Sequence, residues 1–332
     1  MIVAAAFASM CASATAATLK TIYSFCRADL CRDGRSPAAP LLIDESGNLF
    51  GQTEAGGKGS GGVIFQFARG NSREQLLHAF CENPKNDTCK DGAQPGSRLI
   101  MDQTGDLYGT TESGGADFAG TVFELIPNAD RSKWKIKVLH TFCSSCSDGS
   151  TPRGGLTYAG ATSGALYDGV SPLYGATELG GANSHGTIFE LDVVPGKTKR
   201  REKIIYSFCS QPNCMDGAAP GAGVIADAVG NVFGSAQAGG LQNWGILYEF
   251  TLDAKKKHWT ETVLHNFCAA QDCADGAYFW NRTFYQREGP ARRRRVQIGS
   301  QRHQLPVLGA LHFLLPAELS GRRPADRRPC YG

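Results

Sequence analysis

The sequence predicts an all-β fold, a β-propeller of four-stranded antiparallel blades. Each repeat holds four short apolar runs of strand length, separated by turn residues, and no helical periodicity appears before residue 278. A period of this size indicates a stack of similar supersecondary units, and radial stacking lets each sheet bury both faces. The repeat is marked by a Phe-Cys pair that recurs five times, at Phe25-Cys26, Phe80-Cys81, Phe142-Cys143, Phe208-Cys209 and Phe267-Cys268.

The repeat between Phe80 and Phe142 gives the order of elements most clearly. After an Asp-Gly turn, strands are expected over residues 98–102, 107–111, 120–125 and 134–142. The first two are joined by a tight turn in which Gly105 supplies a positive φ, and a Gly-rich loop joins the second to the third. Four strands joined in sequence predict an antiparallel meander.

The other units repeat this order, although the third carries an insertion at residues 160–172. The repeats span residues 18–277, with complete blades expected at about 33–80, 91–142, 148–208 and 216–267. A lone strand at residues 19–25 matches the fourth strand of a blade, and a cysteine loop follows the last complete blade. These remnants of a fifth blade predict a truncated or incompletely closed propeller. The alternative is a linear β-solenoid, whose coils are usually shorter.

The two ends of the chain differ from the repeats. Residues 1–17 are apolar and Ala-rich and end in small residues, which predicts a signal peptide; the alternative is a disordered terminus. Residues 278–332 form an Arg-rich irregular tail with eleven arginines and no lysine. A shifted reading frame would explain this tail, because moving the frame by one base at residues 289–294 can restore a repeat-like motif. The alternative is a patch for nucleic acid or an anionic membrane at residues 292–295.

Ten of the twelve cysteines form five close pairs, and we expect each pair to be a disulfide of an exported protein. The short Cys143/Cys146 spacing also suits zinc or redox chemistry, but each pair belongs to a different blade. The expected location is secreted, periplasmic or at the cell surface. The expected disulfides are Cys26–Cys31, Cys81–Cys89, Cys143–Cys146, Cys209–Cys214 and Cys268–Cys273.

The string Leu-x-x-Asp-x-x-Gly-Asn-Leu-Tyr-Gly-Thr-Thr-x-x-Gly-Gly, followed by Gly-Thr-Val-Phe-Glu-Leu, resembles the GloVer tandem repeat of exported bacterial choice-of-anchor proteins. It is present at residues 99–115 with 120–125, where Asp106 replaces Asn, and again in the other three units. The resemblance implies a propeller-like fold and brings no assigned activity. The third-unit insertion, Ser235-Ala236-Gln237 in the fourth unit and the missing fifth blade depart from the pattern.

In a propeller, the cysteine loops and the Gly-Gly loops lie on one face, which predicts a face rich in carboxylates. A ring of these groups could bind Ca²⁺, a cation or a sugar, and the alternative is that each Asp caps its own turn. We expect no bound metal and no cofactor. The candidates are Asp33, Asp91, Asp148, Asp216 and Asp275, with Glu54, Glu112 and Glu178.

Histidines offer one further candidate. His78, His140 and His265 stand where other units have Tyr, so we interpret them as packing positions. His185, in a Gly-Gly loop, is the only histidine we would test as a catalytic base. No nucleophile elbow, zinc-protease motif or phosphate loop is present in the sequence.

The leading hypothesis is an exported or surface binding or structural module that is not an enzyme. Its ligand is unknown, with polysaccharide or a cell-surface protein as the partners considered; neither nucleic acid nor a membrane span is expected. The alternative is a propeller hydrolase or lyase that acts on carbohydrate or a small ester or lactone, using carboxylates or His185 on the cysteine-loop face.

Overall fold

The computed structural model describes residues 20–82, 89–143, 147–197, 199–253, 255 and 258–276, with the backbone of three strands beyond them. These residues form an all-β protein whose only helices are four three-residue 3-10 turns. Three of those turns lie in cysteine loops, because the second cysteine of each pair ends a tight turn. The predicted signal peptide lies outside the described residues, as does most of the tail.

Two four-stranded antiparallel sheets occupy the first half of the chain, each with its strands in sequence order, as the meander predicts. The first sheet contains β1 (Leu42–Ile43), β2 (Leu49–Thr53), β3 (Val63–Phe67) and β4 (Glu74–Ala79). The second sheet contains β5 (Ile100–Met101), β6 (Leu107–Thr111), β7 (Thr121–Pro127) and β8 (Trp134–Thr141).

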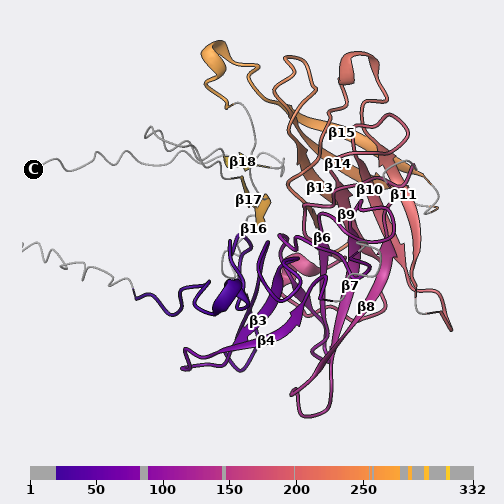
Figure 1. Cartoon of the computed structure of the whole chain (residues 1–332). Coiled ribbons are helices and arrows are strands. Elements are labelled where there is room, and N and C mark those ends of the chain that lie inside the picture. The colour runs from indigo at the N-terminus through magenta and orange to yellow at the C-terminus, as the bar shows by residue number, and fades with distance from the viewer. Residues whose placement is uncertain are drawn as a thin grey trace, which may run out of the picture.

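Two more sheets follow in the same order around the molecule (Figure 1). In the third sheet the insertion shortens the first strand to a single bridge between Thr157 and Tyr174. That sheet contains β9 (Leu173–Thr177), β10 (Thr187–Asp192) and β11 (Arg201–Ser207). The fourth sheet contains β12 (Val224–Ala226), β13 (Val232–Ala236), β14 (Ile246–Leu252) and β15 (Trp259–Asn266).

Every outer strand carries a bulge at the same repeat position. In the first sheet the register shifts between Ile64 and Phe65, so that Leu77 has no partner residue on β3. The same shift recurs in the second, third and fourth sheets. A bulge turns the following side chain, and the residue that follows it is His78, His140, Tyr206 or His265. The bulge therefore sets the direction of the position that exchanges His with Tyr.

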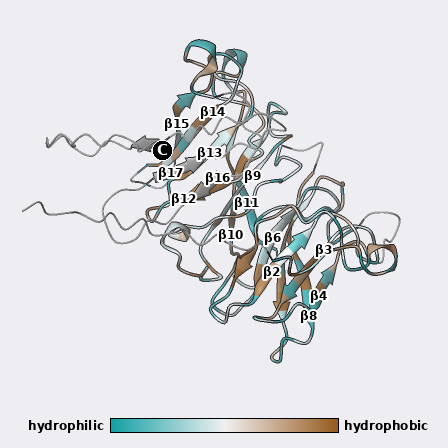
Figure 2. Cartoon of the chain, turned by 90° about the vertical axis from the view of Figure 1, so that its left-hand side faces the viewer, coloured by the Kyte–Doolittle hydropathy of each residue, from teal (hydrophilic) through white to brown (hydrophobic). Residues whose placement is uncertain are grey.

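The core lies between neighbouring sheets. Phe50, Ile64 and Phe80 of the first sheet pack against Leu107 and Phe123 of the second. Equivalent clusters join the second sheet to the third and the third to the fourth. Hydrophobic segments accordingly run along the strands in Figure 2. Each inner sheet thus buries both faces, which is the arrangement that the repeat pattern predicts.

The lone N-terminal strand expected at residues 19–25 is a wrong prediction, because residues 20–25 form no strand. The fourth strand of a blade needs a third strand to pair with, and none of the described strands pairs with residues 20–25. The apolar side chains still pack as predicted: the rings of Tyr23 and Phe25 lie against Phe67 and Phe65 of β3.

The tail adds a small three-stranded sheet of β16 (Thr283–Tyr285), β17 (Arg295–Ile298) and β18 (His312–Leu314), where the sequence predicts no repeat. β16 lies beside β12, and Figure 1 places this sheet on the side between the first and fourth sheets. Within the described residues, no helix has the length and apolarity to cross a membrane.

Candidate functional site

Cysteine loops and Gly-Gly loops lie on the same face, because they hydrogen bond to each other within one sheet. The Gly57 amide donates to the Cys31 carbonyl at 3.0 Å. The same bond recurs from Gly115 to Cys89 at 3.0 Å and from Gly240 to Cys214 at 2.9 Å. The repeat thus presents two loops from every sheet on one face, and this face holds the candidate residues.

Consecutive sheets are joined on this face by a repeated backbone hydrogen bond. The Gln94 amide donates to Gly61, Thr151 to Ala119 and Ala219 to His185, at 2.8–2.9 Å. Each donor has a positive φ, which costs free energy for a residue with a side chain. The bond and the adjacent Asp-Gly turn hold that conformation, so the spacing between neighbouring Gly-Gly loops is set by the backbone.

The five aspartates of the cysteine loops are held by internal contacts at the outer strands. Asp33 accepts from the Tyr23 hydroxyl at 2.9 Å and from two backbone amides of its own loop. Asp91 lies 2.9 Å from His78 Nε2, and Asp275 lies 3.2 Å from His265 Nε2. The histidines still pack: each ring makes an edge contact with the Phe two residues later. Asp91 and Asp275 therefore fasten their loops to the outer strands β4 and β15, and Asp33 fastens its loop to Tyr23.

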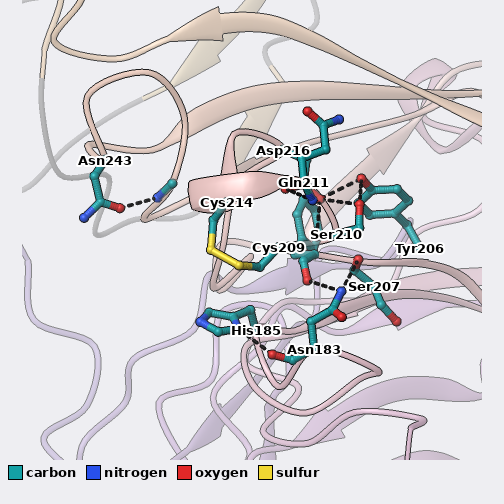
Figure 3. Close-up of a disulfide and its surroundings, with 12 residues drawn as sticks. Asn183, His185, Tyr206, Ser207, Cys209, Ser210, Gln211, Cys214, Asp216 and Asn243 are labelled. Atoms are coloured by element: carbon teal, nitrogen blue, oxygen red, sulfur yellow. Dashed lines mark hydrogen bonds between the residues drawn. A yellow bond between two sulfur atoms is a disulfide. The ribbon is translucent and has the colours of Figure 1, made fainter.

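The Asp216 cluster shows the contacts most fully (Figure 3). Its carboxylate accepts from the Tyr206 hydroxyl at 2.7 Å and from the amides of Ser210 and Gln211. Burial raises the pKa of Asp216, but these hydrogen bonds outweigh it and leave the pKa below its usual range. The Tyr206 hydroxyl also lies 3.1 Å from Glu261 on β15. Burial, with the Asp216 charge, raises the pKa of Glu261 to about 7.

The equivalent cluster one sheet earlier contains a histidine. His140 Nε2 lies 3.3 Å from Asp148 and 3.8 Å from Glu202 on β11. Burial lowers the pKa of His140, against the opposing effect of Asp148. Burial and the Asp148 charge raise the pKa of Glu202 to about 8. His140 thus lies within ion-pair distance of two carboxylates, those of Asp148 and Glu202.

The three candidate glutamates form a separate group around Arg153. The Arg153 guanidinium lies 3.1 Å from Glu112 and 3.0 Å from Glu178, which come from different sheets. Carboxylate oxygens of Glu54 and Glu112 both lie 3.2 Å from the point where a Cβ on Gly96 would stand. Burial raises the pKa of Glu112, although Arg153 opposes it. The structure brings these glutamates together, apart from the aspartates.

A cavity of about 400 Å³ opens beside Arg153. The inner edges of all four sheets contribute, through Leu41, Ile100, Leu156 and Val224, so the cavity lies where these edges converge. Its polar lining includes Ser97, Arg98, Thr157, Tyr158 and Thr162. A concave, partly apolar site with a few converging polar groups is the usual form of a ligand pocket. We call it the axial cavity.

His185 lies beside the Cys209–Cys214 disulfide, and its ring contacts the Asn183 carbonyl (Figure 3). The side chain is exposed, and the described residues place no carboxylate against it. Both neighbouring sulfurs are committed to the disulfide, so they are not thiolate ligands. The Asn183 carbonyl orients the ring, and His185 stays a candidate base that is exposed on this face.

Four of the five predicted disulfides are present, with Cα atoms 4.0–4.4 Å apart. Cys146 of the fifth pair lies outside the described residues. Disulfides of this number favour an oxidising compartment.

Two important residues were missed from the sequence. Arg153 follows the Asp-Gly turn of the third unit, and Glu202 stands six residues before Phe208. Glu74 and Glu261 occupy the same position before Phe80 and Phe267, so aligning the repeats on Phe-Cys could have revealed the glutamates. Arg153 has no counterpart in the other units, and no repeat signal marks it.

Residues 10–172 match the Gloeobacter/Verrucomicrobia repeat, which confirms the resemblance based on the tandem motif. No curated protein matches the sequence.

Three solved structures resemble the fold at low identity. An α-L-arabinanase from Penicillium chrysogenum in complex with arabinobiose has 14% identity and a TM-score of 0.41, covering 79% of this chain and 70% of that one. A candidate 6-phosphogluconolactonase from Bacteroides uniformis has 13% identity and a TM-score of 0.36, covering 70% of this chain and 75% of that one. The α-L-arabinofuranosidase PaAbf62A from Podospora anserina, in complex with cellotriose, has 15% identity and a TM-score of 0.33, covering 69% of this chain and 68% of that one. All three carry enzyme names, so the expectation that this chain is not an enzyme is contradicted and is withdrawn.

Proposed function

From the premise that this is a Gloeobacter/Verrucomicrobia repeat protein, we propose that it is an exported or surface β-propeller whose axial cavity binds carbohydrate. The observation that carries the proposal is the cavity of about 400 Å³ beside the Glu112–Arg153–Glu178 ion pairs. The disulfides support export, because they persist in oxidising compartments. Polysaccharide at the cell surface is the partner that fits both features.

The chemistry of the lining supports a sugar. The guanidinium groups of Arg98 and Arg153 donate hydrogen bonds in fixed directions, and the hydroxyl of Thr157 can donate or accept, which suits the hydroxyl groups of a sugar. Leu156 and Val224 offer an apolar wall and Tyr158 an aromatic one for the C–H face of a sugar ring. Among the described residues, the Arg98 guanidinium in the cavity has no ion-pair partner, so it is available to a ligand.

A second candidate is hydrolysis of that carbohydrate at the same site. The observation that favours it is the pair Glu112 and Glu178, on either side of Arg153, with the pKa of Glu112 raised by burial. A glycosidase needs one carboxylic acid to protonate the leaving group and a second carboxylate as base or nucleophile. Glu112 would be the acid and Glu178 the carboxylate.

Binding and turnover can be tested together. The full chain would be titrated with neutral and uronate-containing oligosaccharides by calorimetry, while reducing ends are assayed in parallel. Arg153→Gln breaks both ion pairs at the cavity and should weaken binding at least about tenfold. Arg131→Gln is the control, because Arg131 lies in an exposed hairpin, 4.0 Å from Asp44. Failure to bind any saccharide, or equal binding by Arg153→Gln, would refute the proposal. Release of reducing ends that Glu112→Gln abolishes would establish hydrolysis.

A further inference from the structure

We propose that His140, Asp148 and Glu202 form a zinc site between the second and third sheets, with three protein ligands and a fourth position open to water. One imidazole nitrogen and two carboxylate oxygens converge there, and the three ligating atoms all lie within 4.8 Å of one another. Zinc accepts this donor set, and a site with three protein ligands keeps one position for water or another ligand.

The separations fit a shared metal ion. Ligands at about 2.0–2.1 Å from a tetrahedral zinc lie roughly 3.4 Å from each other. His140 Nε2 lies 3.3 Å from Asp148 Oδ2 and 3.8 Å from Glu202 Oε1. A direct hydrogen bond between such groups would be about 2.7–2.9 Å long. The distances between the three side chains therefore fit coordination of one shared metal ion better than direct hydrogen bonds between them.

Three atoms of the cluster lack hydrogen bonds. His140 Nε2, Asp148 Oδ1 and Glu202 Oε1 are inaccessible to solvent and make no hydrogen bond with the described residues, although His140 Nε2 lies within ion-pair distance of both carboxylates. The side chains themselves are 16%, 20% and 12% exposed, which leaves a route for an ion. Buried polar atoms without partners cost free energy, and a bound cation would satisfy the three ligands together.

The Tyr206–Asp216–Glu261 cluster provides an internal comparison. There the Tyr206 hydroxyl fills the centre, within 2.7 Å of Asp216 and 3.1 Å of Glu261. In that cluster Asp216 Oδ1 also accepts from the Gln211 amide, whereas no described residue donates a hydrogen bond to Asp148 Oδ1.

The two cysteine loops differ in length, since four residues separate Cys209 from Cys214 and only two separate Cys143 from Cys146.

One nearby positive charge opposes a metal ion at the proposed zinc site. Lys199 is near enough to lower the pKa of His140, and its positive charge opposes a metal ion. The His78–Asp91 pair has Ile136 at the repeat position of Glu202, and two ligands should not hold zinc there.

The test uses the full chain with its disulfides intact, stripped with a chelator, dialysed at pH 8 against buffer containing zinc, and then freed of unbound zinc. We expect one zinc ion per chain by elemental analysis, and competition with a chromophoric chelator gives the affinity. Glu202→Gln and His140→Gln should each weaken zinc binding at least tenfold, with circular dichroism confirming that the variants are folded. Asp148→Asn should act in the same way.

The matched controls are His265→Gln, in a His–Asp pair, and Glu261→Gln, in the tyrosine cluster; both should bind zinc as the wild type does. Absence of stoichiometric zinc in the wild type would overturn the proposal. Unchanged affinity in folded Glu202→Gln and His140→Gln would equally overturn it, because the ion would then be held elsewhere.

Discussion

Replacing Glu261 with Gln should stabilise the protein at alkaline pH and leave its stability at pH 4 nearly unchanged. The Tyr206 hydroxyl has one hydrogen and faces both Asp216 and Glu261, so it cannot donate to two ionised carboxylates. The pKa of Glu261 accordingly rises from its ordinary value of 4.5 to about 7, through burial and the Asp216 charge. A folded-state pKa above the unfolded value means that the folded chain is favoured at low pH. That advantage is lost as the pH rises from about 4.5 to about 7.

The full shift from 4.5 to 7 corresponds to about 3.4 kcal/mol. Solvent reaches part of the side chain, so we expect about 1–2 kcal/mol, or roughly 4 °C in Tm. Calorimetric Tm values of the wild type and Glu261→Gln would be compared at pH 4 and pH 8.5. Glu45→Gln is the control, because Glu45 lies exposed in a turn. An equal effect of Glu261→Gln at both pH values would refute the reasoning.

Two further predictions concern the loops of the candidate face. Gly149→Ala should destabilise by about 2–4 kcal/mol, because Gly149 has φ 100° and a Cβ there would overlap Thr177 Oγ1; Gly160→Ala, with φ 86° and open space around it, should cost only about 1 kcal/mol. Similar losses in urea denaturation would contradict the steric part of this argument. Replacing both Cys209 and Cys214 with Ser should cost about 2 kcal/mol, since the bridge closes a loop of five-residue separation, and a loss below 0.5 kcal/mol would show the bridge to be dispensable.

The strands could be predicted because their signals are local. The second strand of the second unit was expected at residues 107–111, and β6 covers Leu107–Thr111. The expected strand at 98–102 is shorter in the structure, with β5 at Ile100–Met101, because only those two residues pair with β6. Alternation and turn glycines mark where a strand is, whereas its length depends on how far the partner strand continues.

The roles of the aspartates were not predictable in the same way. The sequence shows Asp33 and Asp216 in matching loops, but the residues that bind them, Tyr23 and Tyr206, stand ten positions earlier. The two meet because the outer strand bulges and the cysteine loop folds back, and neither feature has a local signal strong enough to read. The prediction that the His and Tyr positions before each Phe-Cys pair pack in the fold is correct for their rings. It leaves out the hydrogen bonds and ion pairs that their polar atoms make with the aspartates.

The charged clusters on the face of the cysteine loops form where two sheets meet. Glu202 reaches His140 and Asp148 from the next outer strand, and Arg153 joins Glu112 to Glu178 across two sheets. Such contacts depend on the rotation between sheets, which no pattern within one repeat encodes. The repeats therefore supply the same scaffold at every junction, and the proposed zinc site differs from the hydrogen-bonded Tyr206 cluster by the exchange of Tyr for His beside a shorter cysteine loop. A repeat protein of this kind can acquire a site at one junction without disturbing the others, because each junction is held by its own aspartate, bulge and backbone bond.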